Sequence, residues 1–321
     1  MRIMPARHAA RLFLTRRRPT YLRAVITTAC PMRCSYCHME GDPEKAGHRG
    51  GPAPAELDAL LRIAARQGIA KFKFLGGEPL IRADLLRRIA ALRAAAPAAD
   101  LSVITAGVTR PGMLEQTLAA GLDRINVSVH GFDLDAFARR GGTLRSWHAR
   151  NTFLQRVIDA GRPLKVNFVY ANPAERADLA GLLDWAAGRP LAVNVLDDLT
   201  DDAAGPRHIL DLLHELRGPE MARRLEPDPH SLPTTHLFWA DGLRVELKDR
   251  HLGELGPWSA CDGCPARARC REGIFALRLT HDGRLQACMD RPDLSLDIVD
   301  VLRAHGEAAA ERAWRHFVET L

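Results

Sequence analysis

Three cysteines in the segment TTACPMRCSYCH have a spacing that suits metal chemistry. The pattern CxxxCxxC is formed by Cys30, Cys34 and Cys37, and Tyr36 directly precedes the last cysteine. Iron–sulfur clusters prefer the soft thiolate ligand, so three cysteines on one short loop can hold three corners of a 4Fe–4S cluster. No fourth cysteine stands nearby, which leaves one iron open to bind a small chelating cofactor. A zinc site would need His38 as its fourth ligand, but side chains of adjacent residues diverge, which disfavours zinc.

A second cysteine set lies in the C-terminal part of the chain, with the spacing CxxCx5Cx17C. Its members are Cys261, Cys264, Cys270 and Cys288. Two short strands that meet at a turn, DG, are expected to form a hairpin that returns the last cysteine to the other three. Taken alone, four such cysteines are more typical of a zinc ribbon than of an iron–sulfur cluster. The two sets account for all seven cysteines, so none is left for a disulfide or a free nucleophile.

The first cysteine pattern, followed downstream by GGEP at residues 76–79, resembles the radical S-adenosylmethionine (SAM) superfamily. The resemblance implies that the open iron chelates the amino and carboxylate groups of SAM. It also implies reductive cleavage of SAM to a 5′-deoxyadenosyl radical, which abstracts a hydrogen atom from the substrate. The electron would come from a reductant such as flavodoxin or ferredoxin.

The second cysteine set contains Cx12Gx4C, which runs from Cys270 through Gly283 to Cys288. This spacing resembles the half-motif of the SPASM and twitch auxiliary-cluster domains that follow radical SAM barrels. The resemblance implies a second 4Fe–4S cluster in place of zinc. If all four cysteines bind, every iron is saturated, and the cluster conducts electrons or orders the structure. If only three bind, one iron can hold substrate, and the spare cysteine could donate a hydrogen atom.

Within the superfamily, most of the chain resembles the GTP 3′,8-cyclases of molybdenum-cofactor biosynthesis. The similar segments are YLR before the first strand, GGEPLIRADL, LAAGLDRINVSV, LKVN and LRLTHDGRLQAC. By this resemblance the SAM site would contain Tyr36, Gly76, Gly77, Glu78, Thr105 and Ser128. The substrate site would contain Arg23, Lys165 and Arg278. Such residues hold triphosphate in the cyclases, and cationic side chains also suit phosphate on physical grounds.

Several positions depart from the cyclase pattern, mostly in the substrate half. IFA at residues 274–276 replaces the family's Cys-Asn-Arg, which removes one phosphate-binding arginine and moves the auxiliary cysteine upstream to Cys270. The family's C-terminal di-glycine is replaced by VETL at residues 318–321. TAG replaces Thr-Asn-Gly at residues 105–107, and His130 stands where Asp is usual. We therefore expect SAM chemistry on a changed substrate.

Three of these residues also have simpler explanations. Lys165 could be a barrel-end charge that is paired to an acid. Arg278 alternates outward from the predicted hairpin and could be exposed to solvent. His130 stands beside Gly131 and could only shape a turn. Glu78 has few structural uses after two glycines at a strand end, which favours its functional interpretation.

Strands and helices alternate along the first part of the chain. Apolar, β-branched runs predict strands at residues 22–28, 71–75, 101–105, 124–129, 164–170 and 191–196. Helical spacing predicts helices at 54–67, 82–95, 112–120 and 174–187, and a longer helical region, broken near 141–142, that ends at 160. Six strand–helix units predict an α/β fold, a parallel sheet curled into a partial (β/α)6 TIM-type barrel. The resemblance agrees, and the motif residues fall at strand C-terminal ends, where such barrels collect functional groups.

The alternation ends near residue 200, which predicts three regions. We expect a basic N-terminal strap at 1–20, the radical SAM partial barrel at 21–200, and a SPASM/twitch-like auxiliary 4Fe–4S domain at 201–321. Within the last region, the patterns predict a helix at 209–225, a hairpin at 236–248 turning at Asp241-Gly242, and a closing helix at 296–321.

The composition is typical of a cytoplasmic globular protein. Hydrophobic residues make up 46% of the chain, and no apolar run is long enough to predict a membrane span. The cysteine grouping indicates metal binding in a reducing compartment. The net charge is +6, and residues 1–39 contain eight arginines and no acid. This excess indicates an anionic partner, a transit peptide or only a solvated strap.

Together these patterns predict a radical SAM enzyme that binds two 4Fe–4S clusters and SAM. Its substrate could be an anionic nucleotide or phosphorylated small molecule, a ribosomal peptide or natural-product intermediate, or a sugar or aminocyclitol to be dehydrogenated or epimerised. The alternative from another class is a zinc-holding, nucleic-acid-binding protein, which would have no use for GGEP after CxxxCxYC. No side-chain acid or base is nominated, because the cofactor performs the difficult chemistry.

Overall fold

The computed structural model describes residues 18–34, 37, 51–129, 131–171, 173–197, 206–226, 228, 230, 234–248, 258–265, 267, 270 and 273–321. Tyr36, His38 and His130 lie outside the described residues, as does most of the predicted N-terminal strap. In the part of the chain that the structure describes, all twelve strands belong to one sheet. Their order is β12-β11-β10-β1-β2-β3-β4-β5-β6-β9-β8-β7. The predicted α/β fold is therefore confirmed.

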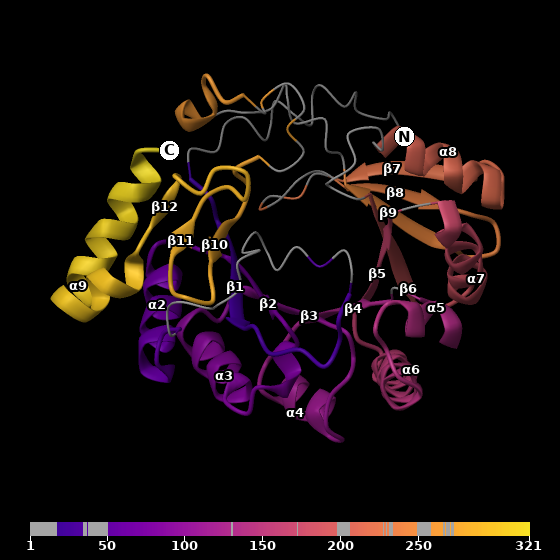
Figure 1. Ribbon diagram of the computed structural model, residues 1–321, viewed down its shortest axis with the longest axis horizontal. Coiled ribbons are helices and arrows are strands. Elements are labelled where there is room, and N and C mark those ends of the chain that lie inside the picture. The colour runs from indigo at the N-terminus through magenta and orange to yellow at the C-terminus, as the bar shows by residue number, and fades with distance from the viewer. Residues whose placement is uncertain are drawn as a thin grey trace.

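Six parallel strands form the centre of this sheet, as predicted. They are β1 (Tyr21–Thr27), β2 (Lys71–Gly76), β3 (Asp100–Thr105), β4 (Arg124–Ser128), β5 (Leu164–Tyr170) and β6 (Leu191–Asp197). The connecting helices are α2 (Pro54–Arg66), α3 (Leu85–Ala95), α4 (Met113–Ala119), α5 (Leu134–Arg139), α6 (Leu144–Asp159) and α7 (Arg176–Ala186). Figure 1 shows the sheet curving round as an open barrel, with these helices along its outer side.

Side chains that alternate in direction along each strand separate the hydrophobic core from the polar inner face of the barrel. Phe72 and Phe74 of β2 are fully buried in one core cluster with Leu60 of α2. Successive side chains of a strand point to opposite faces, so Lys71 and Lys73 occupy the other face. We call this inner face the lumen. The core thus lies between sheet and helices, and the lumen is left to polar residues.

The C-terminal part of the chain extends the same sheet at both edges. At one edge, β10 (Leu277–Leu279) lies parallel to β1, and β11 (Leu285–Gln286) and β12 (Ser295–Leu296) follow. At the other edge, β9 (Arg244–Lys248) lies parallel to β6, and β8 (Thr234–Phe238) and β7 (Ala222–Glu226) follow. Both predicted hairpins are confirmed, and α9 (Ile298–Glu319) is the predicted closing helix. The division at residue 200 stays a prediction, because one continuous sheet contains strands from both sides of it.

The predicted helix at residues 209–225 is wrong in its second half. Helix α8 (Pro206–Arg217) ends before Gly218, whose φ is +70°. A left-handed glycine followed by proline is a common helix stop, because proline cannot continue the helical hydrogen bonding. The chain then enters β7, which pairs antiparallel with β8. None of the described helices is both long and apolar enough to cross a membrane.

Candidate active site and auxiliary metal centre

The first cysteine loop begins where β1 ends. Cys30 and Cys37 are exposed and Cys34 is half-buried. The Cys37 amide donates to the Cys34 carbonyl (3.2 Å), and the Met32 amide donates to Cys30 Sγ (3.4 Å). Partial burial of the Cys30 sulfur raises the pKa of this otherwise exposed residue to about 11, and negative charge on Glu78, Cys34 and Cys37 adds to this shift. A cationic iron cluster would offset this repulsion between neighbouring thiolates, so the loop fits a three-ligand cluster site.

The two glycines of the GGEP motif allow the chain to pack directly on the start of this loop. The Gly77 amide donates to the Thr27 carbonyl (2.7 Å), and the Glu78 amide donates to the Ala29 carbonyl (2.8 Å). A Cβ atom on Gly76 would lie 2.2 Å from the Thr27 oxygen, and one on Gly77 would lie 2.2 Å from the Ala29 oxygen. Any side chain at either position would therefore push the motif away from the cysteine loop.

Glu78 is fully buried at the junction of β2 and β3. Its carboxylate accepts hydrogen bonds from the Thr105 hydroxyl (2.7 Å), the Leu80 amide (3.0 Å) and the Ala106 amide (2.7 Å). Burial raises the pKa of Glu78 to about 7, although these three hydrogen bonds favour the charged form. A carboxylate has about four lone-pair positions, so one acceptor position remains for another donor. Ser128 lies half-buried at the C-terminal end of β4, two strands from Glu78.

The raised pKa of Glu78 predicts a stability that depends on pH. The folded protein holds this proton more tightly than the unfolded chain, so the associated stability is complete below about pH 4.5 and is lost as the pH rises through about 7. The loss amounts to about 3 kcal/mol. Denaturant unfolding without SAM should show that Glu78→Gln removes this part of the pH dependence. Identical pH slopes for the two proteins would contradict the raised pKa.

Three of four cations at the predicted substrate site lie on the adjacent strands β10, β1 and β2, and the fourth, Lys165, lies on β5. Arg23 of β1 is in register with Lys73 of β2 on one side and with Arg278 of β10 on the other. Arg278 is 5% exposed, so the alternative that it points to solvent is wrong. Lys165 of β5 forms an ion pair with buried Glu246 of β9, as its simpler explanation supposed. The structure thus brings Arg23 and Arg278 together and places Lys165 beside an acid.

Sequence reasoning missed Lys73. Lys73 is half-buried on the lumen face of β2. Desolvation of its ammonium group, followed by the charges of Arg23, Lys71, Lys165 and Arg124, holds the pKa of Lys73 well below its usual range. Its ammonium group lies 6.0 Å from the Tyr21 ring and makes no ion pair with any described residue. The alternation of lysine and phenylalanine in KFKFL could have indicated this residue. It places Lys73 on the same face of the sheet as Arg23 once β1 and β2 pair in register.

Comparisons with known proteins place this architecture in a family. The family model of the radical SAM superfamily matches residues 24–186, from within β1 to the end of α7. This chain belongs to the radical SAM superfamily. It is 32% identical over 293 residues to a probable GTP 3′,8-cyclase of Methanocella arvoryzae, covering 91% of this chain and 88% of that protein. It is 32% identical over 316 residues to a GTP 3′,8-cyclase of Mycobacterium marinum, covering 93% and 82%.

A solved structure agrees with this assignment at the level of the fold. SuiB of Streptococcus suis, solved with S-adenosylmethionine bound, superposes with a TM-score of 0.57 at 15% identity. The match covers 89% of this chain and 66% of SuiB. The chain is thus a radical SAM enzyme with the predicted partial barrel, and its family implies a 4Fe–4S cluster and SAM.

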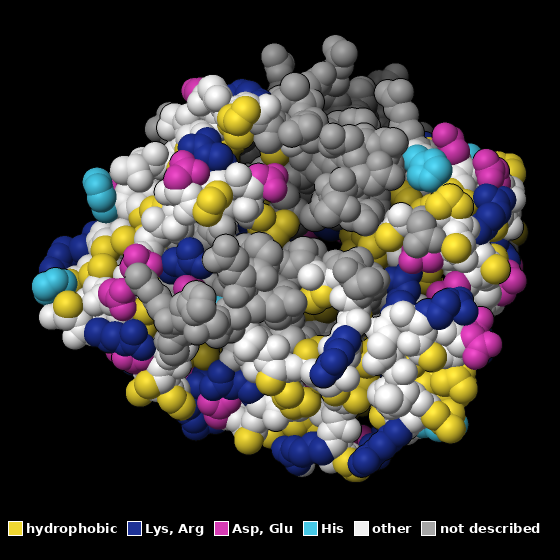
Figure 2. All heavy atoms as spheres, viewed as in Figure 1, with side chains coloured by type: hydrophobic (Ala, Val, Ile, Leu, Met, Phe, Trp, Pro, Cys, Tyr) yellow, Lys and Arg dark blue, Asp and Glu magenta, His cyan; other side chains and the backbone are white. Residues whose placement is uncertain are grey.

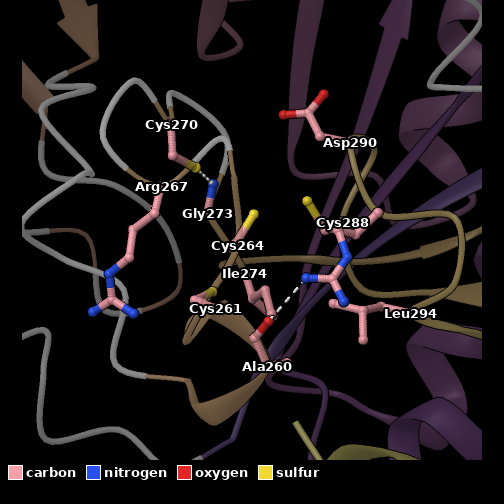
Figure 3. Close-up of a pocket in the computed structure, with 11 residues that line it drawn as sticks. Ala260, Cys261, Cys264, Arg267, Cys270, Gly273, Ile274, Cys288, Asp290 and Leu294 are labelled. Atoms are coloured by element: carbon pink, nitrogen blue, oxygen red, sulfur yellow. Dashed lines mark hydrogen bonds between the residues drawn. The ribbon is translucent and has the colours of Figure 1, made fainter.

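The second cysteine set of this radical SAM enzyme lines a single pocket. Figure 3 shows the side chains of Cys261, Cys264, Cys270 and Cys288 arranged around it. Burial raises the pKa of Cys288 to about 11. The Ala260 amide and the Ser259 hydroxyl both donate hydrogen bonds to the Leu321 carbonyl oxygen (2.8 and 2.9 Å). These bonds hold the first cysteine of the set against the end of α9.

The second cysteine set offers four thiols at one pocket. Within the described residues, no three His, Cys, Asp or Glu side chains are placed to hold one metal ion. One zinc would require all four sulfur atoms at about 2.3 Å from a common centre. Four thiols are a donor set that suits a polynuclear iron–sulfur group, as they also suit zinc.

On the face shown in Figure 2, lysine and arginine side chains alternate with acidic side chains over the described residues. Proteins that bind nucleic acids typically gather basic residues into a continuous patch or stripe. The described part of this face shows no such patch.

Proposed function

We propose that this radical SAM enzyme acts on an anionic, phosphorylated substrate of the nucleotide class, bound in the lumen. The observation that carries the proposal is the row of cations Arg278, Arg23 and Lys73 on the adjacent strands β10, β1 and β2. Like charges side by side on a sheet face repel one another, and a bound anion would offset part of this repulsion. Guanidinium and ammonium groups are also the side chains that best bind phosphate.

The other lumen cations support this assignment by contrast. Lys71 pairs with Asp228 (2.7 Å), Arg124 pairs with Asp100, and Lys165 pairs with Glu246. These three cations are neutralised by protein carboxylates, whereas Lys73 has no such partner within the described chain. The anion would therefore bind nearer to β10, β1 and β2 than to β5.

The proposed division of roles follows from position in the barrel. Cys30, Cys34 and Cys37 would hold the 4Fe–4S cluster, and Gly76, Gly77, Glu78, Thr105 and Ser128 would border SAM. The family resemblance alone assigns Tyr36 to SAM, because Tyr36 lies outside the described residues. Reductive cleavage of SAM is the chemistry that a reduced cluster supplies here, and it yields a radical that abstracts hydrogen from substrate. Glu78 would accept a hydrogen bond from the SAM ammonium group at its remaining acceptor position. The electron would come from a carrier such as flavodoxin or ferredoxin.

The test is 5′-deoxyadenosine release by the reduced, anaerobic enzyme with and without GTP. GTP is the first nucleotide to try because the 32% identical relatives are named GTP 3′,8-cyclases. Other nucleoside triphosphates and unphosphorylated guanosine complete the set. We expect release to be stimulated by at least one triphosphate and not by guanosine. Stimulation only by uncharged compounds would overturn the proposal.

Lys73→Met should selectively weaken binding of the anionic substrate. A hydrogen bond to a charged group contributes about 1.5–3 kcal/mol, so we expect KM for the stimulating nucleotide to rise roughly 10- to 100-fold. Arg156→Gln is the matched control, because it removes one positive charge from an exposed helical position. Equal KM values for the two variants would contradict the role of Lys73.

A further inference from the structure

One part of the lumen wall carries buried polar side chains away from the proposed phosphate site. Strand β6 contributes Asn194, which is in register with Asn167 of β5 on one side and with Glu246 of β9 on the other. The neighbouring residues Val193 and Val195 belong to the hydrophobic core, so the Asn194 side chain faces the lumen. We call Asn167, Asn194 and Glu246 the β6 wall.

The charged groups at the β6 wall neutralise one another. Glu246 forms ion pairs with Lys165 and with Arg244 (3.0 Å to the latter). Arg244 Nη2 also lies 3.1 Å from His236 Nδ1, and His236 Nε2 lies 3.1 Å from a carboxylate oxygen of Glu226. Two cations thus face two carboxylates. This wall is therefore better suited to an uncharged part of a ligand than to a phosphate group.

Asn194 has one polar atom that the described chain does not satisfy. Its Nδ2 atom donates to Asn167 Oδ1 (2.9 Å), which fixes the orientation of the Asn194 amide. Its Oδ1 atom is buried and accepts no hydrogen bond from any residue that the structure describes. The residue is only 8% exposed. A buried carbonyl without a donor destabilises a fold, so its presence in a ligand-binding lumen indicates that a bound molecule supplies the donor.

We propose that Asn194 is a specificity-determining residue whose Oδ1 atom accepts a hydrogen bond from an uncharged hydroxyl or N–H group of the substrate. The inference rests on the proposed function, in which the phosphate of the same substrate binds the cations of β10, β1 and β2. Four strands separate β1 from β6 in the sheet, and Figure 1 shows these two strands on opposite sides of the open barrel. The substrate would therefore lie across the lumen, with its phosphate at one side and its donor group at the other.

SAM also carries hydroxyl and amino groups, so it is the other source from which this donor could come. The substrate is favoured because the predicted SAM-site residues extend along the sheet only as far as Ser128 of β4. Asn194 lies two strands further along the sheet, beyond β5.

Two substitutions of similar shape test the inference in the reconstituted, full-length enzyme. Asn194→Val removes the amide, whereas Asn194→Thr keeps a hydroxyl oxygen that can accept a hydrogen bond. Calorimetry without reductant gives the Kd values of GTP, inorganic triphosphate and SAM. We expect Asn194→Val to raise the Kd of GTP at least about tenfold, and Asn194→Thr to raise it less than about threefold. Both variants should bind inorganic triphosphate and SAM as the unmodified enzyme does.

Analogues of GTP that each lack one donor identify the group that Asn194 contacts. Inosine triphosphate lacks the exocyclic amino group, 1-methyl-GTP lacks the ring N–H, and 2′-deoxy-GTP and 3′-deoxy-GTP each lack one ribose hydroxyl. One analogue should bind the unmodified enzyme about tenfold more weakly than GTP and should lose no further affinity in Asn194→Val. Equal losses for GTP and all four analogues in Asn194→Val would show that Asn194 acts only through the fold, and would overturn the inference.

Three other results would also overturn the inference. The first is an unchanged Kd of GTP in Asn194→Val. The second is an equal loss of affinity for inorganic triphosphate, which would mean that the variant disturbs the phosphate site. The third is a loss of SAM affinity with an unchanged Kd of GTP, which would assign the donor group to SAM.

The failure of this inference can be told apart from the failure of the proposed function. Lys73→Met should weaken binding of both GTP and inorganic triphosphate, whereas Asn194→Val should weaken binding of GTP alone. An unmodified enzyme that binds neither compound would reject the phosphorylated substrate. Guanosine then replaces GTP as the probe, and the comparison of Asn194→Val with Asn194→Thr still decides the role of Asn194. Absence of guanosine binding as well would overturn the inference.

Discussion

Cys34→Ala is expected to abolish SAM cleavage while leaving the auxiliary cluster in place. The three cysteines of the first loop are the only thiols near the GGEP motif in the sequence, and Cys34 is the least exposed of them. With two thiolates left, the site can no longer hold a cluster whose irons each need tight coordination. We expect the rate of 5′-deoxyadenosine release to fall to below about one-thousandth, and the iron content to fall by about half.

Met32→Leu is the matched control for this loss. It changes a buried side chain in the same loop but keeps the backbone N–H of residue 32, which donates to Cys30 Sγ. Iron content, sulfide content and 5′-deoxyadenosine release should stay close to those of the unmodified enzyme. Full iron content and normal SAM cleavage in Cys34→Ala would show that the loop is not the cluster site.

Glu78→Gln is expected to weaken SAM binding without changing the iron content. The substitution removes the negative charge that we propose faces the SAM ammonium group. Truncation of one partner in a buried, hydrogen-bonded charge pair costs about 2–5 kcal/mol. An amide keeps some of the hydrogen bonding, so we expect the lower end of that range, roughly a 30- to 100-fold increase in Kd. Equilibrium titration of the anaerobic enzyme with SAM measures this change.

The pH dependence of SAM binding separates this role of Glu78 from a purely structural one. Below about pH 7 the free carboxyl is protonated, so binding a cation requires the loss of that proton. SAM affinity should therefore fall about tenfold per pH unit below that point in the unmodified enzyme, and should be flat in Glu78→Gln. Thr105→Val removes a donor to the carboxylate and should move the midpoint upward, whereas Thr105→Ser should not. Parallel pH profiles for Glu78→Gln and the unmodified enzyme would exclude the proposed contact.

Local patterns predicted the barrel because each of its strands is short, apolar and followed by a periodic helix. All six parallel strands lie within one residue of their predicted bounds. Where local pattern and tertiary context disagreed, context prevailed. Residues 222–226 had helical spacing, but after Gly218 they could pair with β8, and strand pairing supplied their backbone hydrogen bonds. Helix α3 likewise begins three residues later than predicted, at Leu85, with Asp84 as its N-cap residue.

The sequence by itself determined the family and the two cysteine sets, because thiolate spacing and the GGEP motif are local properties of the chain. Only the tertiary structure decided how charges pair across strands. It joined Lys165 to Glu246, buried Arg278, and set Lys73 beside Arg23. It also brought Cys288 into the same pocket as Cys261, Cys264 and Cys270, which lie before the β10–β11 hairpin in the chain. These contacts join residues far apart in the chain, and register and packing, which no short sequence pattern encodes, bring them together.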